Sequence, residues 1–183
     1  MFLTTNNYPL LKISVQEKET TNQPDFLDVF RVPASGRIVA LDPGTKRIGV
    51  AVSDELQITT RAVETIPRTG WKKLLLQIKE ILARFDAAGL VIGLPYNFDG
   101  SESEMSRDAR RLARNFSLSL DVPVCLQDER VTSYEAKGRL WKQGVSGKEF
   151  RERVDNEAAA IILSDFIERR NELKKSVPPE IKG

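Results

Sequence analysis

The sequence predicts an α/β fold in which three strands form a meander, two parallel strands extend it, and helices cover both faces of the sheet. Three observations predict this fold. Short apolar runs alternate with longer stretches in which apolar residues recur at helical spacing. The first three apolar runs are separated by turns only, which is typical of antiparallel neighbours. Each later run follows a helical stretch, as a right-handed crossover to a parallel strand requires.

The meander is predicted to consist of strands over residues 37–41, 48–53 and about 58–66. Apolar residues at helical spacing then predict an amphipathic helix over residues 71–85. The continuous apolar run 89–94 is typical of a strand that is buried on both faces.

A second helix is predicted to begin at Ser101, because Ser101 and Glu104 match a capping box. A fifth strand is predicted over residues 122–127, a third helix over 132–142 and a fourth over 148–170. This order of elements is that of the ribonuclease H-like architecture, with a five-stranded mixed sheet.

The folded domain is expected to span residues 37–171. Polar and charged residues dominate the segment 1–36, which we interpret as a flexible extension, and residues 172–183 contain two prolines and are expected to form a loose tail. We find no secretory signal, transit peptide or stretch of transmembrane length. The single cysteine, Cys125, rules out a disulfide framework. These features predict a cytoplasmic protein that does not bind membranes.

The composition limits the kinds of catalysis that this chain can carry out. The 183 residues include no histidine, so general acid–base catalysis by histidine and histidine-rich zinc sites are excluded. The formal net charge is only +2, so binding to a nucleic acid would need cations gathered at one place. Catalysis would therefore depend on carboxylates, other polar side chains or a bound metal.

The first candidate site residue is Asp42, which ends an apolar run and is followed by the turn residues Pro43 and Gly44. Lys46 and Arg47 come directly after the turn. A carboxylate can hold a hard divalent ion, and neighbouring cations can hold a phosphate. Asp-Pro-Gly is also strong turn chemistry without any function. A similar Asp-x-Gly-Thr turn opens the actin-like ATPases, but their two large lobes need a longer chain.

Two further groups of acids lie at positions typical of a site. Asp128 and Glu129, followed by Arg130, come at the carboxyl end of the fifth predicted strand. Asp155 lies near the start of the last predicted helix, on the border of its buried stripe. Each acid could instead cap its own element. Because all three elements are predicted to point to one edge of the sheet, the pattern favours a site for a divalent metal.

Four segments resemble, in order, the YqgF/RuvX family of Holliday-junction resolvases, which are also described as nucleases that mature the precursor of 16S ribosomal RNA. The segments are LDPGTKRIGVAVSD, VIGLPYNFDGSES, CLQDERVTSYEA and VDNEAAAIILSDF. The resemblance covers roughly residues 36–170, and the long N-terminal extension departs from it. It implies a ribonuclease H-like fold, a cytoplasmic bacterial protein and metal-dependent hydrolysis of phosphodiester bonds.

The resemblance places the catalytic acids at Asp42, Asp128, Glu129 and Asp155. We expect Asp42, Asp155 and one of the Asp128/Glu129 pair to hold one or two Mg²⁺ or Mn²⁺ ions, which would activate a water and stabilise the leaving oxygen. Strand alternation places Asp128 on the face of Leu126 and Glu129 on the other. Because a strand can fray at its end, parity does not decide between them, and we prefer Glu129 for its reach.

Three cations, Lys46, Arg47 and Arg130, are expected to bind phosphates that flank the scissile bond. Arg107, Arg110, Arg111 and Arg114 of the second helix are interpreted as a solvated face rather than a binding strip.

The function implied by this resemblance is cleavage of the 16S ribosomal RNA precursor at its 5′ end. Two alternatives remain at this stage. One is cleavage of branched DNA, which would require a symmetric dimer with two active sites. The other is a non-catalytic module that binds a nucleic acid, a ribosomal factor or a transcription factor.

Overall fold

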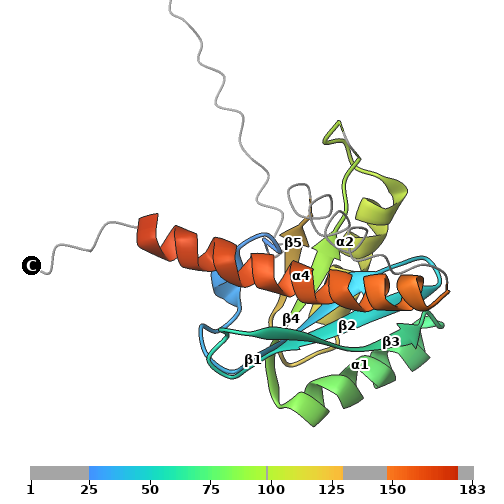
Figure 1. Cartoon of the computed structure of the whole chain (residues 1–183), viewed down its shortest axis with the longest axis horizontal. Helices are drawn as coiled ribbons and strands as arrows, with labels where there is room; N and C mark the ends of the chain where they lie inside the picture. The colour runs from blue at the N-terminus through green and yellow to red at the C-terminus, as the bar shows by residue number, and fades with distance from the viewer. Residues whose placement is uncertain (1–24, 98, 130–147, 177–183) are drawn as a thin grey trace, which may run out of the picture.

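The fold is a single mixed sheet with helices on both faces (Figure 1). The computed structural model describes residues 25–97, 99–129 and 148–176, the last range with side chains from Glu157 onward. The strands are β1 (Arg37–Pro43), β2 (Arg47–Ser53), β3 (Thr60–Pro67), β4 (Ala87–Leu94) and β5 (Val124–Asp128). The helices are α1 (Trp71–Phe85), α2 (Glu104–Ser117) and α4 (Lys148–Ser176), and a short 3₁₀ helix, η1, spans Val29–Arg31.

The sheet has five strands in the order β3-β2-β1-β4-β5. β2 pairs antiparallel with both β1 and β3, whereas β4 is parallel to β1 and β5 is parallel to β4. β1 is therefore central, and β1, β4 and β5 end at the same edge. The predicted ribonuclease H-like fold is confirmed.

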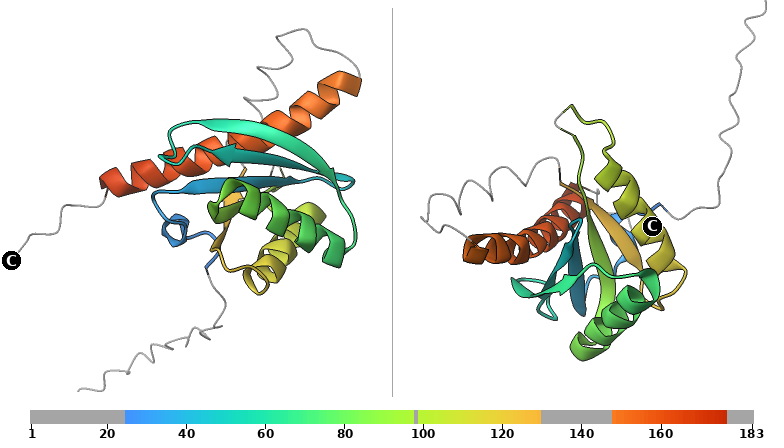
Figure 2. Two further views of the ribbon diagram at one scale, coloured as in Figure 1. Left: turned by 90° about the horizontal axis from the view of Figure 1, so that it is seen from below. Right: turned by 90° about the vertical axis from the view of Figure 1, so that its right-hand side faces the viewer.

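Each face of the sheet has its own apolar core. Helices α1 and α2 cover one face and α4 lies across the other, as Figure 2 shows. Trp71 of α1 and Phe116 of α2 pack with their ring centroids 5.0 Å apart, which joins the two helices over the first core. Phe166 of α4 is fully buried in the second core. Side chains that alternate along β1, β4 and β5 thus enter one core or the other.

The N-cap of helix α2 lies two residues later than the sequence predicts. Its N-cap is Ser103, whose side chain accepts a hydrogen bond from the backbone N–H of Ser106, and the Ser106 hydroxyl bonds the backbone of Ser103 in return. Ser101 is instead bonded to Asp99 within the preceding loop. The capping-box pattern fits Ser101 with Glu104, but the loop places Ser103 at the cap, where Ser106 takes the position of the glutamate.

The predicted flexible extension, residues 1–36, is wrong for its last part. Val29 and Val32 are each 2% exposed, and both belong to the core under α4. The carbonyl of Phe26 accepts a hydrogen bond of 2.7 Å from the backbone N–H of Leu126 in edge strand β5. Residues 25–36 therefore pack on the domain because they cover apolar surface and the open edge of β5. Residues 1–24 lie outside the described part of the chain.

The predicted boundary at the other end also changes. Helix α4 continues to Ser176, although a loose tail was expected from residue 172 onward. Arg170 is 2% exposed and donates to the carbonyl of Pro33 over 3.0 Å and to the side chain of Gln57. These contacts hold the helix on the domain as far as Arg170, and residues 171–176 are exposed. The helix predicted over residues 132–142 lies outside the described residues.

Candidate active site

Asp42 lies one residue before the end of the central strand β1. It is opposite Gly49 of β2 in the antiparallel register and is half-buried. Ile38 and Ala40 of the same strand belong to the core under α4. Because side chains alternate along a strand, Asp42 lies on this α4 side of the sheet.

The turn after Asp42 is tight and places two cations in solvent. The backbone N–H of Gly44 bonds the carbonyl of Asp42 at 3.0 Å. A side chain at position 44 would put its Cβ 2.7 Å from the carbonyl oxygen of Arg47, so the close approach of the chain requires glycine. Lys46 and Arg47 are both exposed. The turn therefore presents positive charge next to the strand that carries Asp42, as the sequence predicts.

Arg68, which follows β3, braces this turn. Its backbone N–H donates to the carbonyl of Lys46 and its guanidinium to the carbonyl of Gly44, each over 3.0 Å. The same guanidinium forms an ion pair with Asp108 of α2. Sequence reasoning missed Arg68. Its only signal was its place after the third strand, which the antiparallel register of Arg47 with Pro67 brings alongside the turn.

The structure separates Asp128 from Glu129. β5 stays paired through Asp128, which is opposite Leu94, and the backbone N–H of Glu129 donates to the carbonyl of Leu94 over 3.2 Å. Val124 and Leu126 belong to the core under α1 and α2. Alternation therefore places Asp128 on that face, and Glu129, one residue later, on the α4 side with Asp42.

Gly93 of β4 makes room for the carboxylate of Glu129. A Cβ at position 93 would collide with Oε1 of Glu129 and would lie 2.8 Å from Cδ1 of Ile162 in α4. The Glu129 carboxylate thus lies over Gly93, between the sheet and α4, and its Oε1 is buried. β1 and β4 are in register at Leu41 and Ile92, so Asp42 and Gly93 follow side by side. Sequence reasoning missed the role of Gly93.

Two of the predicted site residues, Asp155 and Arg130, lie partly or wholly outside the part of the chain that the structure describes. Asp155 lies in α4, about two turns before Ile162, but its side chain is outside the described part. Arg130 lies outside the described residues altogether. Among the side chains that are described, no group of three or more His, Cys, Asp or Glu is placed to hold a metal ion. Of the predicted acids, the structure places Asp42 and Glu129 on the same side of the sheet, at the edge where β1, β4 and β5 end.

The donors on the α4 side suit a hard divalent cation. Carboxylate oxygens are preferred by Mg²⁺ and Mn²⁺, and the space above Gly93 would be filled by any larger residue. Softer ligands are missing from this edge of the described sheet. Cys125 is buried in the middle of β5, where burial raises the pKa of its thiol to about 12. The described part of the site thus offers carboxylate oxygens as ligands for a divalent cation.

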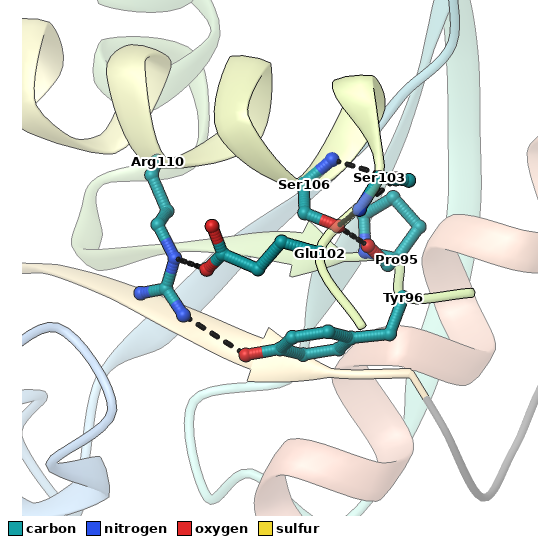
Figure 3. A network of polar contacts seen from close by, with 6 residues as sticks. All are labelled: Pro95, Tyr96, Glu102, Ser103, Ser106 and Arg110. Carbon is teal, nitrogen blue, oxygen red and sulfur yellow. Dashed lines mark hydrogen bonds and ion pairs between the residues drawn. The ribbon is translucent and has the colours of Figure 1, made fainter. Parts of the chain in front are cut away.

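The loop from β4 to α2 is held by a polar network (Figure 3). The Arg110 side chain donates to a Glu102 carboxylate oxygen over 2.6 Å and to the Tyr96 hydroxyl oxygen over 2.9 Å. The Ser106 hydroxyl donates to the carbonyl of Pro95. These bonds fix the loop that leaves the site edge of β4, and they also fix the first turns of α2.

The chain belongs to the RuvX family. The model of this family, described as Holliday junction resolvase, matches residues 36–169. This match confirms the family that the sequence motifs indicate, and it places the chain in a class of enzymes that hydrolyse phosphodiester bonds.

Curated relatives match over nearly their whole length. A protein of Anaeromyxobacter dehalogenans (strain 2CP-C), named "Putative pre-16S rRNA nuclease", is 44% identical over 134 residues, which are 73% of this chain and 98% of the relative. A protein of the same name from Novosphingobium aromaticivorans is 43% identical over 133 residues, 73% of this chain and 85% of the relative.

Among solved structures, Thermus thermophilus RuvC in complex with a Holliday junction substrate is similar, with a TM-score of 0.43 and 15% identity over 73% of this chain and 96% of that chain. The yeast mitochondrial Holliday junction resolvase Ydc2 has a TM-score of 0.43 and 13% identity over 84% of this chain and 86% of that chain. Within the described residues, no helix has the length and hydropathy needed to cross a membrane.

Proposed function

We propose that this protein is a metal-dependent nuclease that cleaves the precursor of 16S ribosomal RNA at its 5′ end in the cytoplasm. The observation that carries this proposal is the placement of Asp42 and Glu129 on the same side of the sheet, on either side of Gly93. The names of the curated relatives support the choice of substrate.

In this proposal Asp42, Glu129 and Asp155 hold one or two Mg²⁺ or Mn²⁺ ions. A bound divalent ion lowers the pKa of water and neutralises charge on the scissile phosphate. We assign the ligand role to Glu129 rather than Asp128, because the Glu129 carboxylate lies on the side of Asp42. Asp128 remains near the site without this role.

The cations would position the substrate. Lys46 and Arg47 extend into solvent from the turn after Asp42 and would bind phosphates next to the scissile bond, together with Arg130. Arg68 would act indirectly, because its bonds to the carbonyls of Gly44 and Lys46 keep the turn in shape.

The test is cleavage of labelled 16S precursor RNA, unstructured single-stranded RNA and four-way junction DNA, each with Mg²⁺, Mn²⁺ or EDTA. We expect metal-dependent cleavage of the precursor, and none by Asp42→Asn. Asp86→Asn is the matched control, because Asp86 is exposed at the far end of α1 and asparagine tolerates its left-handed conformation. Wild-type cleavage by Asp42→Asn would contradict the proposal.

The role of Asp155 is tested by thermal melting. A metal that binds only the folded state raises the melting temperature by mass action. We expect Mg²⁺ to stabilise the wild-type protein and Asp86→Asn, and to have little effect on Asp155→Asn. An Asp155→Asn variant that keeps the full Mg²⁺ shift would exclude Asp155 as a ligand.

Cleavage of branched DNA is the second candidate, because the matching family is described as Holliday junction resolvase. Resolution of a junction needs two active sites facing two strands. Symmetric cutting of the junction by a dimer, with the precursor RNA left intact, would favour this candidate. Binding without cleavage of any of the three substrates would favour a non-catalytic module.

A further inference from the structure

The four arginines of α2, which the sequence suggests are a uniform solvated face, fall into two groups. The Arg110 side chain donates hydrogen bonds to Glu102 and Tyr96, and Arg111 forms an ion pair with Asp108. Arg107 and Arg114 are exposed, and neither has a carboxylate partner among the described residues. Two of the four positive charges are therefore available to a ligand.

Three of these arginines lie in one line along α2. Positions 107, 111 and 114 are separated by four and three residues, so helical periodicity places them on the same stripe. The stripe extends about 10 Å along the helix at 1.5 Å per residue. Arg111 joins it because its side chain is 72% exposed in spite of its ion pair.

The stripe starts towards the edge of the sheet that carries the site, on the face opposite to the α4 side where Asp42 lies. Helix α2 follows β4, the strand of Gly93, through the braced loop (Figure 1). Arg107 is in the first turn of the helix and Arg114 in its last turn, so Arg107 is nearer the site edge along the helix. Arg68 connects α2 directly to the turn after Asp42. Its guanidinium bonds both the carbonyl of Gly44 in that turn and the carboxylate of Asp108 in α2.

The charge balance of this surface is positive although the whole chain is nearly neutral. Beyond its first residue, α2 carries a single acid, Asp108. That carboxylate is already bonded to Arg68 and Arg111 and is only 18% exposed. An anion approaching the stripe therefore meets little negative charge from α2.

We propose that Arg107, Arg111 and Arg114 form a track for the sugar–phosphate backbone of the RNA strand, leading it along α2 away from the Asp42 site. Guanidinium groups bind phosphates bidentately, and such contacts position a strand without reading its sequence. The identity of the strand rests on the proposed nuclease function. The track itself rests on the charges and exposure of α2.

The experiment measures binding of a fluorescein-labelled single-stranded RNA of mixed sequence by anisotropy over a series of KCl concentrations, in EDTA. All proteins carry Asp42→Asn, so that no cleavage interferes. We compare the parent with the double variant Arg107→Gln/Arg114→Gln. The matched control is Lys174→Gln/Lys175→Gln, which removes two exposed charges at the far end of α4.

Loss of two phosphate contacts should reduce the slope of log K against log [salt] by about 1.4, because each contact on a single strand contributes about 0.7. The control should keep the parental slope. An unchanged slope in the arginine variant, or an equal reduction in the control, would overturn the track. Circular dichroism of each variant ensures that a change in slope is not a loss of fold.

A second arm uses four-way junction DNA as the probe. A reduced slope on the RNA supports the proposal, whereas a reduction on the junction alone would overturn the assignment to an RNA strand. Failure of the proposed function gives a different result. If the wild-type protein cleaves nothing while the arginine variant still loses slope, the track stands and the nuclease proposal fails.

Discussion

The two ends of the sheet use charged and polar residues in opposite ways. At the end opposite the site, Gln57 and Arg170 are 3% and 2% exposed, and they are bonded to each other and to the carbonyl of Pro33. At the site end, Asp42 is only half-buried, and Lys46 is exposed on the adjoining turn.

This difference between the two ends indicates which charged side chains serve stability and which serve function. The buried guanidinium of Arg170 satisfies carbonyl and amide oxygens and joins three segments that are distant in the sequence. A polar group buried in this way serves stability, since leaving it without partners would be costly. Carboxylates and cations gathered at an accessible strand edge contribute little packing and are typical of a binding site. Changes at one end should therefore affect stability, and changes at the other should affect activity.

The largest contrast is expected between two aspartates, one at each end. Asp42→Asn should lower metal-dependent cleavage by at least about 10³-fold, because removing a ligand charge costs several kcal/mol of transition-state stabilisation. Asp54→Asn, at the turn after β2, should leave the cleavage rate unchanged. Rates measured under saturating substrate, with melting curves for both proteins, test this contrast. Equal effects of the two changes would remove the distinction between the ends.

A smaller loss of cleavage rate is expected from Gly93→Ala. The added Cβ would push the Glu129 carboxylate from its place over β4, and displacement of a catalytic group by about 1 Å can cost about 10²-fold in rate. Gly70→Ala is the control, because a Cβ at position 70 has no atom within 4 Å. Retention of full activity by Gly93→Ala would show that Glu129 is not a ligand.

At the opposite end, Arg170→Met should lower the free energy of unfolding by about 2 kcal/mol, because Gln57 and the carbonyl of Pro33 lose a buried partner. For a domain of this size we expect a fall in melting temperature of about 4–8 °C. The cleavage rate per folded molecule should not change. A large loss of activity at a temperature where the variant is fully folded would mean that this end also serves catalysis.

The smallest expected effect is the contribution of Asp54 to the pH dependence of stability. Hydrogen bonds from the backbone N–H of Thr59 and then of Ile58 lower the pKa of the Asp54 carboxyl. A lowered pKa in the folded state contributes stability above the unfolded value of about 3.9, and that contribution is lost as the pH falls through the folded value. The melting temperatures of wild type and Asp54→Asn should therefore converge below about pH 4. A constant difference down to pH 2 would contradict this role of Asp54.

The predicted elements are correct where neighbours along the chain decide the structure. Helix α1 has the predicted limits, 71–85, because its apolar spacing is complete within the helix itself. The strand–turn–strand unit around Asp42 also follows the prediction, since alternation and turn chemistry are local.

Features that depend on distant partners were missed or misread. The packing of residues 25–36 depends on Leu126 and on the core under α4, which are far away in the sequence. Arg68 gained its role only when the antiparallel register placed it against Gly44 and α2 supplied Asp108. The nearby sequence of the segment 25–36 and of Arg68 gives no signal of these distant contacts.

The sequence by itself determined the order of the elements, the family and the acids that could form a site, because these depend on periodicity, turn chemistry and motif. Only the tertiary structure decided which acid of the pair at the end of β5 shares a side with Asp42. That choice depends on continued pairing of β5 with β4 and on a glycine at position 93, which leaves space for the Glu129 carboxylate beneath α4. The physical reason is that the direction and space available to a side chain are set by neighbouring strands and helices.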